Sequence, residues 1–279
     1  NEDKGLDEWN NINILETIEN WVNNSGNDDK PFPGNKKLNL SDDGFPLNVI
    51  FSGPPGTGKT YAAKELLKGI HEDHQKTVCF HPAMAYEDFV RAMEYDGNGF
   101  NSVNKVFGQI CDKALGDPDN LYAILIDEIN RANLPAVLGE LMSALEYRGK
   151  PYHVANEVDG GNRDKGQLIV PPNLLIIGTM NTADRSTGIL DYALRRRFAF
   201  FHFKPNLKVV SDNAANDTFK KVLELFYEVP TNNSGKSSYL APDIEPNDVA
   251  IGHSYFLKDD WEFKAEFQVA PILEEYLRD

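Results

Sequence analysis

GPPGTGKT, residues Gly53–Thr60, says more about the fold of this 279-residue chain than any other stretch. It matches the phosphate-binding pattern GxxxxGK[ST] at every fixed position. In this pattern the glycines allow a tight turn whose backbone N–H groups point at phosphate oxygens. Lys59 supplies a positive charge for the outer phosphates, and the Thr60 hydroxyl can bind Mg²⁺. The sequence therefore predicts a nucleotide-binding loop with these members: Gly53, Pro54, Pro55, Gly56, Thr57, Gly58, Lys59, Thr60 and the adjacent Tyr61.

The flanks of this loop have the composition that the pattern requires. An apolar run at Leu47–Ser52 precedes it, and a helix-like segment at Tyr61–Ile70 follows it. Further apolar runs alternate with helical stretches, which is typical of βαβ units around a parallel sheet. We therefore predict an α/β fold with a five-stranded parallel sheet between helices, whose other strands are Thr77–Phe80, Leu121–Asp127, Asn173–Thr179 and Phe198–Phe203.

The chain divides by composition into three parts. Residues 1–46 are rich in Asn and Asp and predict one helix, around Leu6–Val22, and a linker. Residues 47–205 form the nucleotide-binding core, with a helix at Leu134–Tyr147 and a hairpin near 151–170 around a Gly-Gly turn. Residues 206–279 predict a small, mostly helical lid, because Phe219, Val222 and Leu223 recur at helical spacing.

Charge and cysteine content restrict the class of protein. The formal net charge is −15, so DNA would have to be contacted locally or through another domain or subunit. Cys79 and Cys111 are the two cysteines, and reduced, buried thiols favour a cytoplasmic location. No apolar run is long enough to cross a membrane. The histidines show no metal-ligand spacing, so we expect no metal except nucleotide-bound Mg²⁺.

Polar side chains follow two of the predicted strands directly. Asp127 and Glu128 end the run at Leu121, and Asn181 follows the run at Asn173. Since ligands bind at the carboxyl edge of a parallel sheet, we assign Asp127 to Mg²⁺ and Glu128 to polarising the attacking water. Asn181 can orient that water because an amide both donates and accepts. The alternatives are a solvated turn for the acidic pair and a turn cap for Asn181. Asp184 is a weaker candidate for the same site.

Arg195, Arg196 and Arg197 form the densest positive cluster of this acidic chain, just before the last predicted strand. An arginine that reaches across a subunit boundary can stabilise the charge on a transferring phosphoryl group. We assign this role to Arg195 or Arg196, and a structural salt bridge to another member of the cluster. Arg131, just after the acidic pair, is a second candidate for such a contact. The alternative for all of them is pairing with surface carboxylates.

In this order, the motifs resemble those of the AAA+ superfamily, whose subunits form rings with nucleotide at each boundary. Three segments are similar to signatures of the McrB family of restriction motors: Asp127–Asn133, Met180–Ser186 and Ile251–Phe256. The resemblance implies a hexameric homo-oligomer that hydrolyses GTP with Mg²⁺, and a McrC-like nuclease subunit as partner. It also implies that the hairpin near 151–170 meets the partner or DNA at the ring centre.

Two other functions remain open on the sequence alone. One is an ATP-dependent protein remodeller similar to MoxR-type chaperones, since the phosphate loop does not distinguish guanine from adenine. The other is a ring scaffold that binds nucleotide without hydrolysing it. Glu128 and Asn181 are evidence against the scaffold, because a scaffold has no need of groups that orient water.

Overall fold

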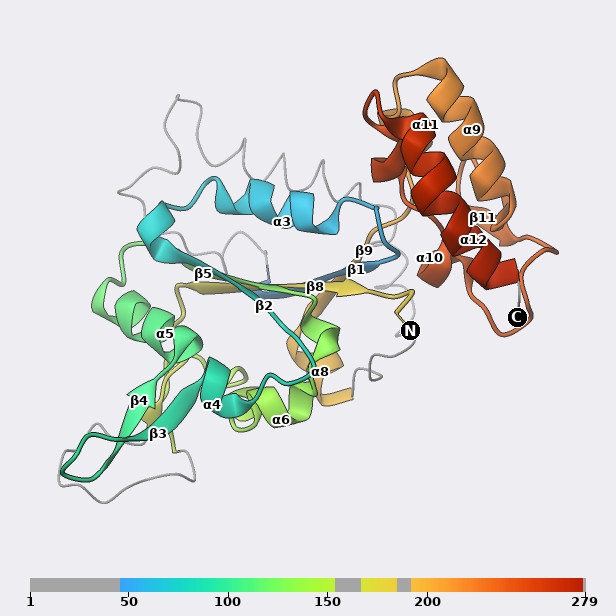
Figure 1. The fold of residues 1–279 in the computed structure, drawn as a ribbon. Helices are drawn as coiled ribbons and strands as arrows, with labels where there is room; N and C mark the ends of the chain where they lie inside the picture. Colours follow the sequence, from blue (N-terminus) through green and yellow to red (C-terminus); the bar gives the residue numbers. More distant parts are fainter. Residues whose placement is uncertain (1–45, 154–166, 185–191, 278–279) are drawn as a thin grey trace, which may run out of the picture. The chain divides into compact units, whose positions relative to one another are not determined.

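The largest element of the fold is a five-stranded sheet with the strand order β2-β5-β8-β1-β9 (Figure 1). It belongs to a computed structural model that describes residues 46–153, 167–184 and 192–277. Strand β2 pairs in parallel with β5, and β5 pairs in parallel with β8. The predicted α/β core with its parallel sheet is confirmed. The strands are β1 (Asn48–Gly53), β2 (Gln75–Cys79), β5 (Tyr122–Asp127), β8 (Leu174–Asn181) and β9 (Ala199–His202).

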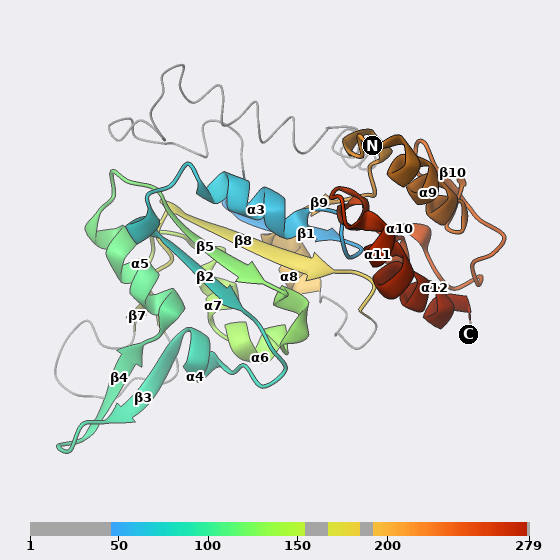
Figure 2. The same cartoon turned by 45° about the horizontal axis from the view of Figure 1, so that its top comes forward.

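The centre of the sheet is apolar on both faces. Residues 122–126 of β5 and 174–179 of β8 are buried, and exposure begins only at the carboxyl ends of the two strands. Strands covered on both faces need continuous apolar runs, which is why the sequence shows no alternation there. Helix α3 (Lys59–Leu67) lies on one face, and α5 (Val106–Gly116) and α6 (Leu134–Leu138) lie on the other (Figure 2).

A half-buried arginine is hydrogen bonded to the start of the central strands. Arg148 donates to the carbonyl oxygens of Pro171 and Leu174, at 2.8 and 2.7 Å, and also to the Asn48 side chain. Burial lowers the pKa of Arg148 to about 10, so the side chain is still charged near neutral pH. The guanidinium thus satisfies one carbonyl group before β8 and one at its first residue.

The helix predicted over Leu134–Tyr147 is wrong in one respect, because it is broken in the structure. Helix α6 ends at Leu138, and α7 (Leu141–Ala144) begins three residues later. Gly139 between them has a φ of 47°, a backbone conformation that residues with a Cβ rarely adopt. Two further helices of this part are α4 (Tyr86–Phe89) and α8 (Tyr192–Arg197).

Two antiparallel hairpins are inserted into the core. Strands β6 (Tyr152–His153) and β7 (Gln167–Leu168) form the base of the hairpin predicted near 151–170, whose tip lies outside the described residues. Strands β3 (Arg91–Tyr95) and β4 (Phe100–Asn104) form a second hairpin that we did not predict. Their sequences, RAMEY and FNSVN, lack the regular apolar alternation of a strand with one buried face.

Contacts divide the chain into two compact units. Among the described residues, the first unit comprises 46–50, 63–153, 167–179 and 192–201, and the second comprises 51–62, 180–184 and 202–277. The phosphate loop therefore belongs to the same unit as the carboxyl-terminal lid. The predicted helix around Leu6–Val22 lies outside the described residues.

The lid is mostly helical, as predicted. It contains α9 (Asn213–Glu224), α10 (Pro246–Val249), α11 (Trp261–Lys264) and α12 (Ala270–Leu277), with a short hairpin of β10 (Tyr227–Val229) and β11 (Ser234–Lys236). Phe219 of α9 stacks on Phe256 with ring centroids 4.8 Å apart, inside a buried apolar cluster. No helix in the described part of the chain has the length and hydropathy needed to cross a bilayer.

Candidate nucleotide-binding site

The predicted phosphate loop lies between β1 and α3. Lys59 is only 6% exposed, and its ammonium donates to the carbonyl oxygens of Gly53 at 2.9 Å and Pro54 at 2.8 Å. The Thr57 hydroxyl donates to the same Pro54 oxygen at 2.8 Å. The loop is thus closed on itself around a buried positive charge. Gly56 and Gly58 have φ angles of 78° and 87°, which explains the need for glycine at both positions.

The loop leads directly into the amino-terminal end of a helix. Helix α3 begins at Lys59, and the Ala62 N–H already donates to the Gly58 oxygen at 2.9 Å. Unpaired N–H groups and the helix dipole favour anions at this end of a helix. Loop and helix together are therefore suited to bind phosphate groups.

The lid belongs to the same unit as the phosphate loop and is hydrogen bonded to it. The Gly252 N–H donates to the Pro55 oxygen at 3.0 Å, and the Ser254 N–H donates to the Gly56 oxygen at 2.9 Å. A Cβ added at Gly56 would lie 2.6 Å from the Tyr255 ring. The segment Gly252–Tyr255 was noted in the sequence for its family resemblance, and its His253 was expected to be a core histidine or to pack near the nucleotide. The backbone hydrogen bonds between this segment and the loop were not predicted, because about 200 residues separate the two partners.

The segment after β8 also contacts the loop. The Thr182 N–H donates to the carbonyl oxygen of Gly53 at 3.1 Å, and the Thr182 hydroxyl donates to the backbone carbonyl oxygen of Asp248 at 2.8 Å. Asn181, the last residue of β8, is thereby held one residue from an anchor on the phosphate loop. Asp184, two residues after Thr182, is half-buried. This placement is compatible with the predicted water-orienting role of Asn181, which stays a prediction.

The acidic pair lies at the carboxyl end of β5, as predicted, and is held by a residue that sequence reasoning missed. Thr179 of β8 is 2% exposed. Its hydroxyl donates to Asp127 Oδ1 and accepts the Glu128 N–H at 3.2 Å. Glu128 has a φ of 55°, so its backbone is in the left-handed region that non-glycine residues rarely adopt. A polar side chain within the buried, otherwise apolar part of a strand was the available signal for Thr179.

We expect Thr179→Val to lower the maximal hydrolysis rate about tenfold or more. Valine has nearly the shape of threonine, but it cannot donate to Asp127 or accept from Glu128, and a buried unsatisfied N–H costs about 1–3 kcal/mol. Steady-state kinetics and nucleotide affinity, measured on the same preparations, check this. Thr179→Ser is the matched control and should keep most of the rate, whereas an unchanged rate in the valine variant would contradict the role.

One member of the arginine cluster makes a structural salt bridge. The Arg197 guanidinium pairs with Glu146 at 2.6 Å and donates to the Ala193 oxygen at 2.8 Å, and its side chain is 11% exposed. Arg195 and Arg196 are exposed, with the Arg195 guanidinium 5.7 Å from the Phe200 ring centroid. Arg197 is thus the structural member, and the role of the other two stays a prediction. Arg131 Nε lies 3.5 Å from Glu128 Oε2, in an ion pair between residues three apart in the sequence.

The residues predicted for Mg²⁺ fit a hard cation by their chemistry. Asp127 offers a carboxylate whose orientation is fixed by the Thr179 hydroxyl, and Thr60 offers a hydroxyl at the start of α3. Oxygen donors of this kind are those that Mg²⁺ uses together with substrate phosphates. In the described part of the chain, no group of three or more His, Cys, Asp and Glu side chains could hold a metal by itself.

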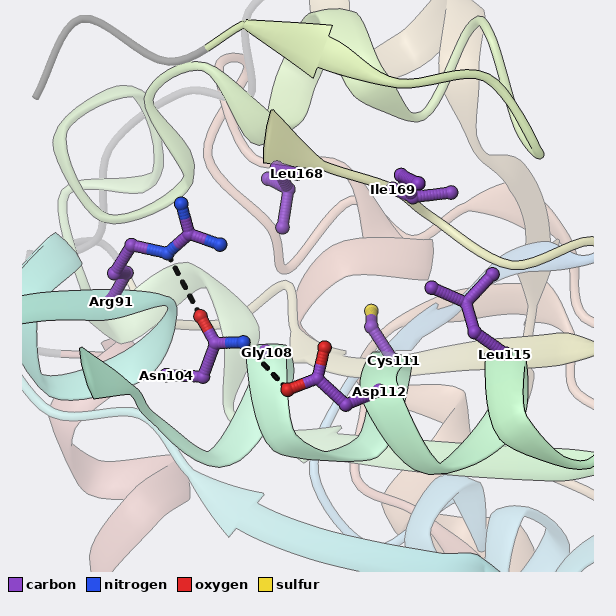
Figure 3. Close-up of a pocket in the computed structure, with 8 residues that line it drawn as sticks. All are labelled: Arg91, Asn104, Gly108, Cys111, Asp112, Leu115, Leu168 and Ile169. Atoms are coloured by element: carbon purple, nitrogen blue, oxygen red, sulfur yellow. Dashed lines mark hydrogen bonds between the residues drawn. The ribbon is translucent and has the colours of Figure 1, made fainter. Parts of the chain in front are cut away.

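A separate cavity of about 190 Å³ lies in the first unit (Figure 3). On its polar side, Arg91 Nε donates to Asn104 at 2.8 Å, and the Asn104 amide donates to Asp112 at 2.6 Å. No residue predicted for nucleotide binding lines it, so it belongs to the bases of the inserted elements rather than to the phosphate loop. Its lining is Arg91, Asn104, Gly108, Cys111, Asp112, Leu115, Leu168 and Ile169.

Comparison with known proteins agrees with the motifs. The sequence profile described as AAA domain (dynein-related subfamily) matches residues 48–198. The chain is 34% identical over 253 residues to the type IV methyl-directed restriction enzyme EcoKMcrB subunit of Escherichia coli (strain K12), covering 83% of this chain and 54% of that protein. It is 30% identical over 196 residues to the type II restriction enzyme BsuMI component YdiS of Bacillus subtilis (strain 168), covering 56% and 57%.

A shorter match extends the comparison to another class of protein. The chain is 34% identical over 95 residues to the ORC1-type DNA replication protein 6 of Halobacterium salinarum, covering 30% of this chain and 25% of that protein. The chain spans about half the length of the two restriction-enzyme relatives. Their activities as whole proteins therefore do not transfer directly to this chain.

Proposed function

Because the chain belongs to the AAA domain family, in its dynein-related subfamily, we propose that it is the nucleotide-hydrolysing ring motor of a McrB-like restriction system. The observation that carries the proposal is the closed phosphate loop around the buried Lys59 ammonium, at the start of α3. Ordinary turn residues would be sufficient for a loop with a purely structural role, and such a loop would not need a buried lysine. Both restriction-enzyme relatives support the system to which we assign the motor.

The residues of the chain divide the reaction among them. Loop N–H groups and Lys59 bind the phosphates of the nucleoside triphosphate. Glu128 accepts a proton from the attacking water, and Asn181 orients that water towards the terminal phosphate. Thr60 and Asp127, together with the phosphates, would hold Mg²⁺, which would neutralise the charge that develops on the phosphate oxygens. Thr179 acts indirectly, by fixing Asp127 and the backbone of Glu128.

The finer assignments are part of the same proposal. The nucleotide is GTP rather than ATP, the ring is a hexamer in the cytoplasm, and hydrolysis drives DNA translocation that activates a McrC-like nuclease subunit. They follow from the resemblance to the McrB family described above, and the similarity to the EcoKMcrB subunit supports the restriction system among them. A net charge of −15 further supports DNA contact through another domain or subunit, since phosphate contacts need clustered cations.

Hydrolysis of GTP and ATP, measured side by side with Mg²⁺ over a range of protein concentration, tests the proposal. We expect GTP turnover per subunit to rise with protein concentration, because each nucleotide would lie at a boundary between assembled subunits. Preference for ATP would favour a protein remodeller instead. Binding without turnover of either, also with a McrC-like subunit added, would favour a scaffold. Lys59→Ala should bind neither nucleotide and serves as the background control.

A mixing experiment tests the arginines. By itself, the Arg195→Ala or the Arg196→Ala variant should lose nucleotide hydrolysis. When the variant is mixed with Glu128→Gln, we expect part of the hydrolysis to return. In a mixed ring, some boundaries combine an intact Glu128 from one subunit with an intact arginine from its neighbour. Turnover measured across mixing ratios checks this. Absence of rescue at every ratio, with mixed assembly verified, would contradict a role across the boundary.

A further inference from the structure

His253 lies at the junction between the lid and the phosphate loop. The backbone of its two neighbours is hydrogen bonded to the loop, through Gly252 to Pro55 and through Ser254 to Gly56. Its side chain is half-buried in the second unit. These two neighbours therefore hold His253 beside the phosphate loop.

The hydrogen bonds of the ring determine where its proton lies. Nδ1 of His253 accepts the Asn206 N–H at 3.3 Å, so the proton of the neutral imidazole is on Nε2. Burial lowers the pKa of His253 to about 4, so the ring is neutral near pH 7. Nε2 lies on the side of the phosphate loop, 3.6 Å from the position that a Cβ on Gly58 would take.

The loop depends on such neighbours for its shape. Gly56 and Gly58 both have positive φ angles, and glycine loses more conformational freedom on folding than other residues. Strained or flexible backbone persists only where its surroundings hold it. A Cβ on Gly56 would lie 2.6 Å from the Tyr255 ring, and a Cβ on Gly58 would lie 3.6 Å from His253 Nε2, so both rings lie beside the loop. A neutral ring beside Gly58 adds no second cation next to Lys59, so its contribution comes from shape rather than charge.

We propose that His253 is a positioning residue for nucleotide binding, which links the backbone at Asn206 to the turn at Gly58 and so holds the loop N–H groups in the phosphate-binding arrangement. This inference rests on the proposed function, in which the loop binds a nucleoside triphosphate. It also specifies that the residue acts on affinity, through the loop, rather than on the chemical step.

His253→Leu, His253→Asn and the exposed-site control His71→Asn test the proposal. Leucine removes both ring nitrogens, whereas the asparagine side chain can still accept the Asn206 N–H near the position of Nδ1. We expect the leucine variant to raise the KM and the dissociation constant for GTP about tenfold or more, with kcat changed less than about threefold, and the asparagine variant to recover part of the affinity. His71→Asn should behave as wild type, since His71 is exposed and hydrogen bonds only within its own turn.

Hydrogen exchange of the amides of residues 53–60, without nucleotide, is the second readout. We expect faster exchange there in His253→Leu, with the core strands unchanged. Unchanged exchange and unchanged affinity in both His253 variants would overturn the inference alone. Wild-type protein that binds neither GTP nor ATP would overturn the proposed function, and the exchange data would still decide whether His253 holds the loop. A loss of affinity that only follows a loss of folded protein would mean a general structural role.

Discussion

We expect Gly252→Ala to abolish tight nucleotide binding. A Cβ at this position would lie 2.0 Å from the carbonyl carbon of Gly56, 2.1 Å from its oxygen and 2.4 Å from the Thr57 nitrogen. These are backbone atoms, so no side-chain rotation relieves the overlap, and the loop or the lid segment must move. Overpacking costs about 1–3 kcal/mol, and 3 kcal/mol carried by the loop is about a hundredfold in affinity.

Titration with a fluorescent guanine nucleotide measures this effect. Gly116→Ala is the matched control, because a Cβ there meets nothing within 4 Å. We expect the control to bind as wild type, with equal or slightly higher thermal stability, since alanine restricts the unfolded chain more than glycine. Wild-type affinity in Gly252→Ala would show that the contact between the lid and the loop is not needed for binding.

The second large effect is expected from Glu128→Gln. Glutamine keeps the size of the side chain but cannot accept the proton of the attacking water, and loss of a general base typically costs about 10²–10⁴ in rate. Nucleotide affinity should change little, because the phosphate loop and Lys59 are intact. The variant should therefore bind GTP and retain it, which single-turnover hydrolysis and a retention assay measure together.

Asp88→Asn is a suitable comparison for this substitution. It also replaces a carboxylate by an amide, but its side chain accepts the Ala85 N–H at the exposed start of α4. We expect its hydrolysis rate to be close to that of wild type. Turnover by Glu128→Gln at the wild-type rate would remove Glu128 from the role of base, and a parallel loss of affinity would indicate that the residue serves the fold.

The sequence allowed the sheet and the loop to be predicted because both depend on local rules. Buried parallel strands require unbroken apolar runs, and positive φ angles at Gly56 and Gly58 require glycine. The break at Gly139 was missed because a single glycine inside a helical pattern is usually tolerated. Its φ of 47° is visible only once the packing of α6 and α7 is known.

The parts of the site that could not be predicted depend on contacts between distant residues. Thr179 is separated by 51 and 52 residues from the groups that it bonds, and no spacing rule connects them. His253 accepts a hydrogen bond from Asn206, 47 residues away, while its other ring nitrogen lies on the side of Gly58. Its neighbour Gly252 must be glycine because a Cβ there would lie 2.0–2.4 Å from backbone atoms of the loop. Pattern reasoning finds residues whose type is required by their own backbone. It does not find those required by a partner elsewhere.

The support of the loop by the lid affects how this protein can be dissected. A fragment that ended at Pro205 would contain every residue of the phosphate loop, the acidic pair and the arginine cluster, yet it would lack the backbone of Gly252 and Ser254. It would pass any test for motif content and still present a loop without its partner. For this chain, an intact set of motifs is therefore no guarantee of a competent minimal enzyme, and residues 206–279 must be kept in any shortened version.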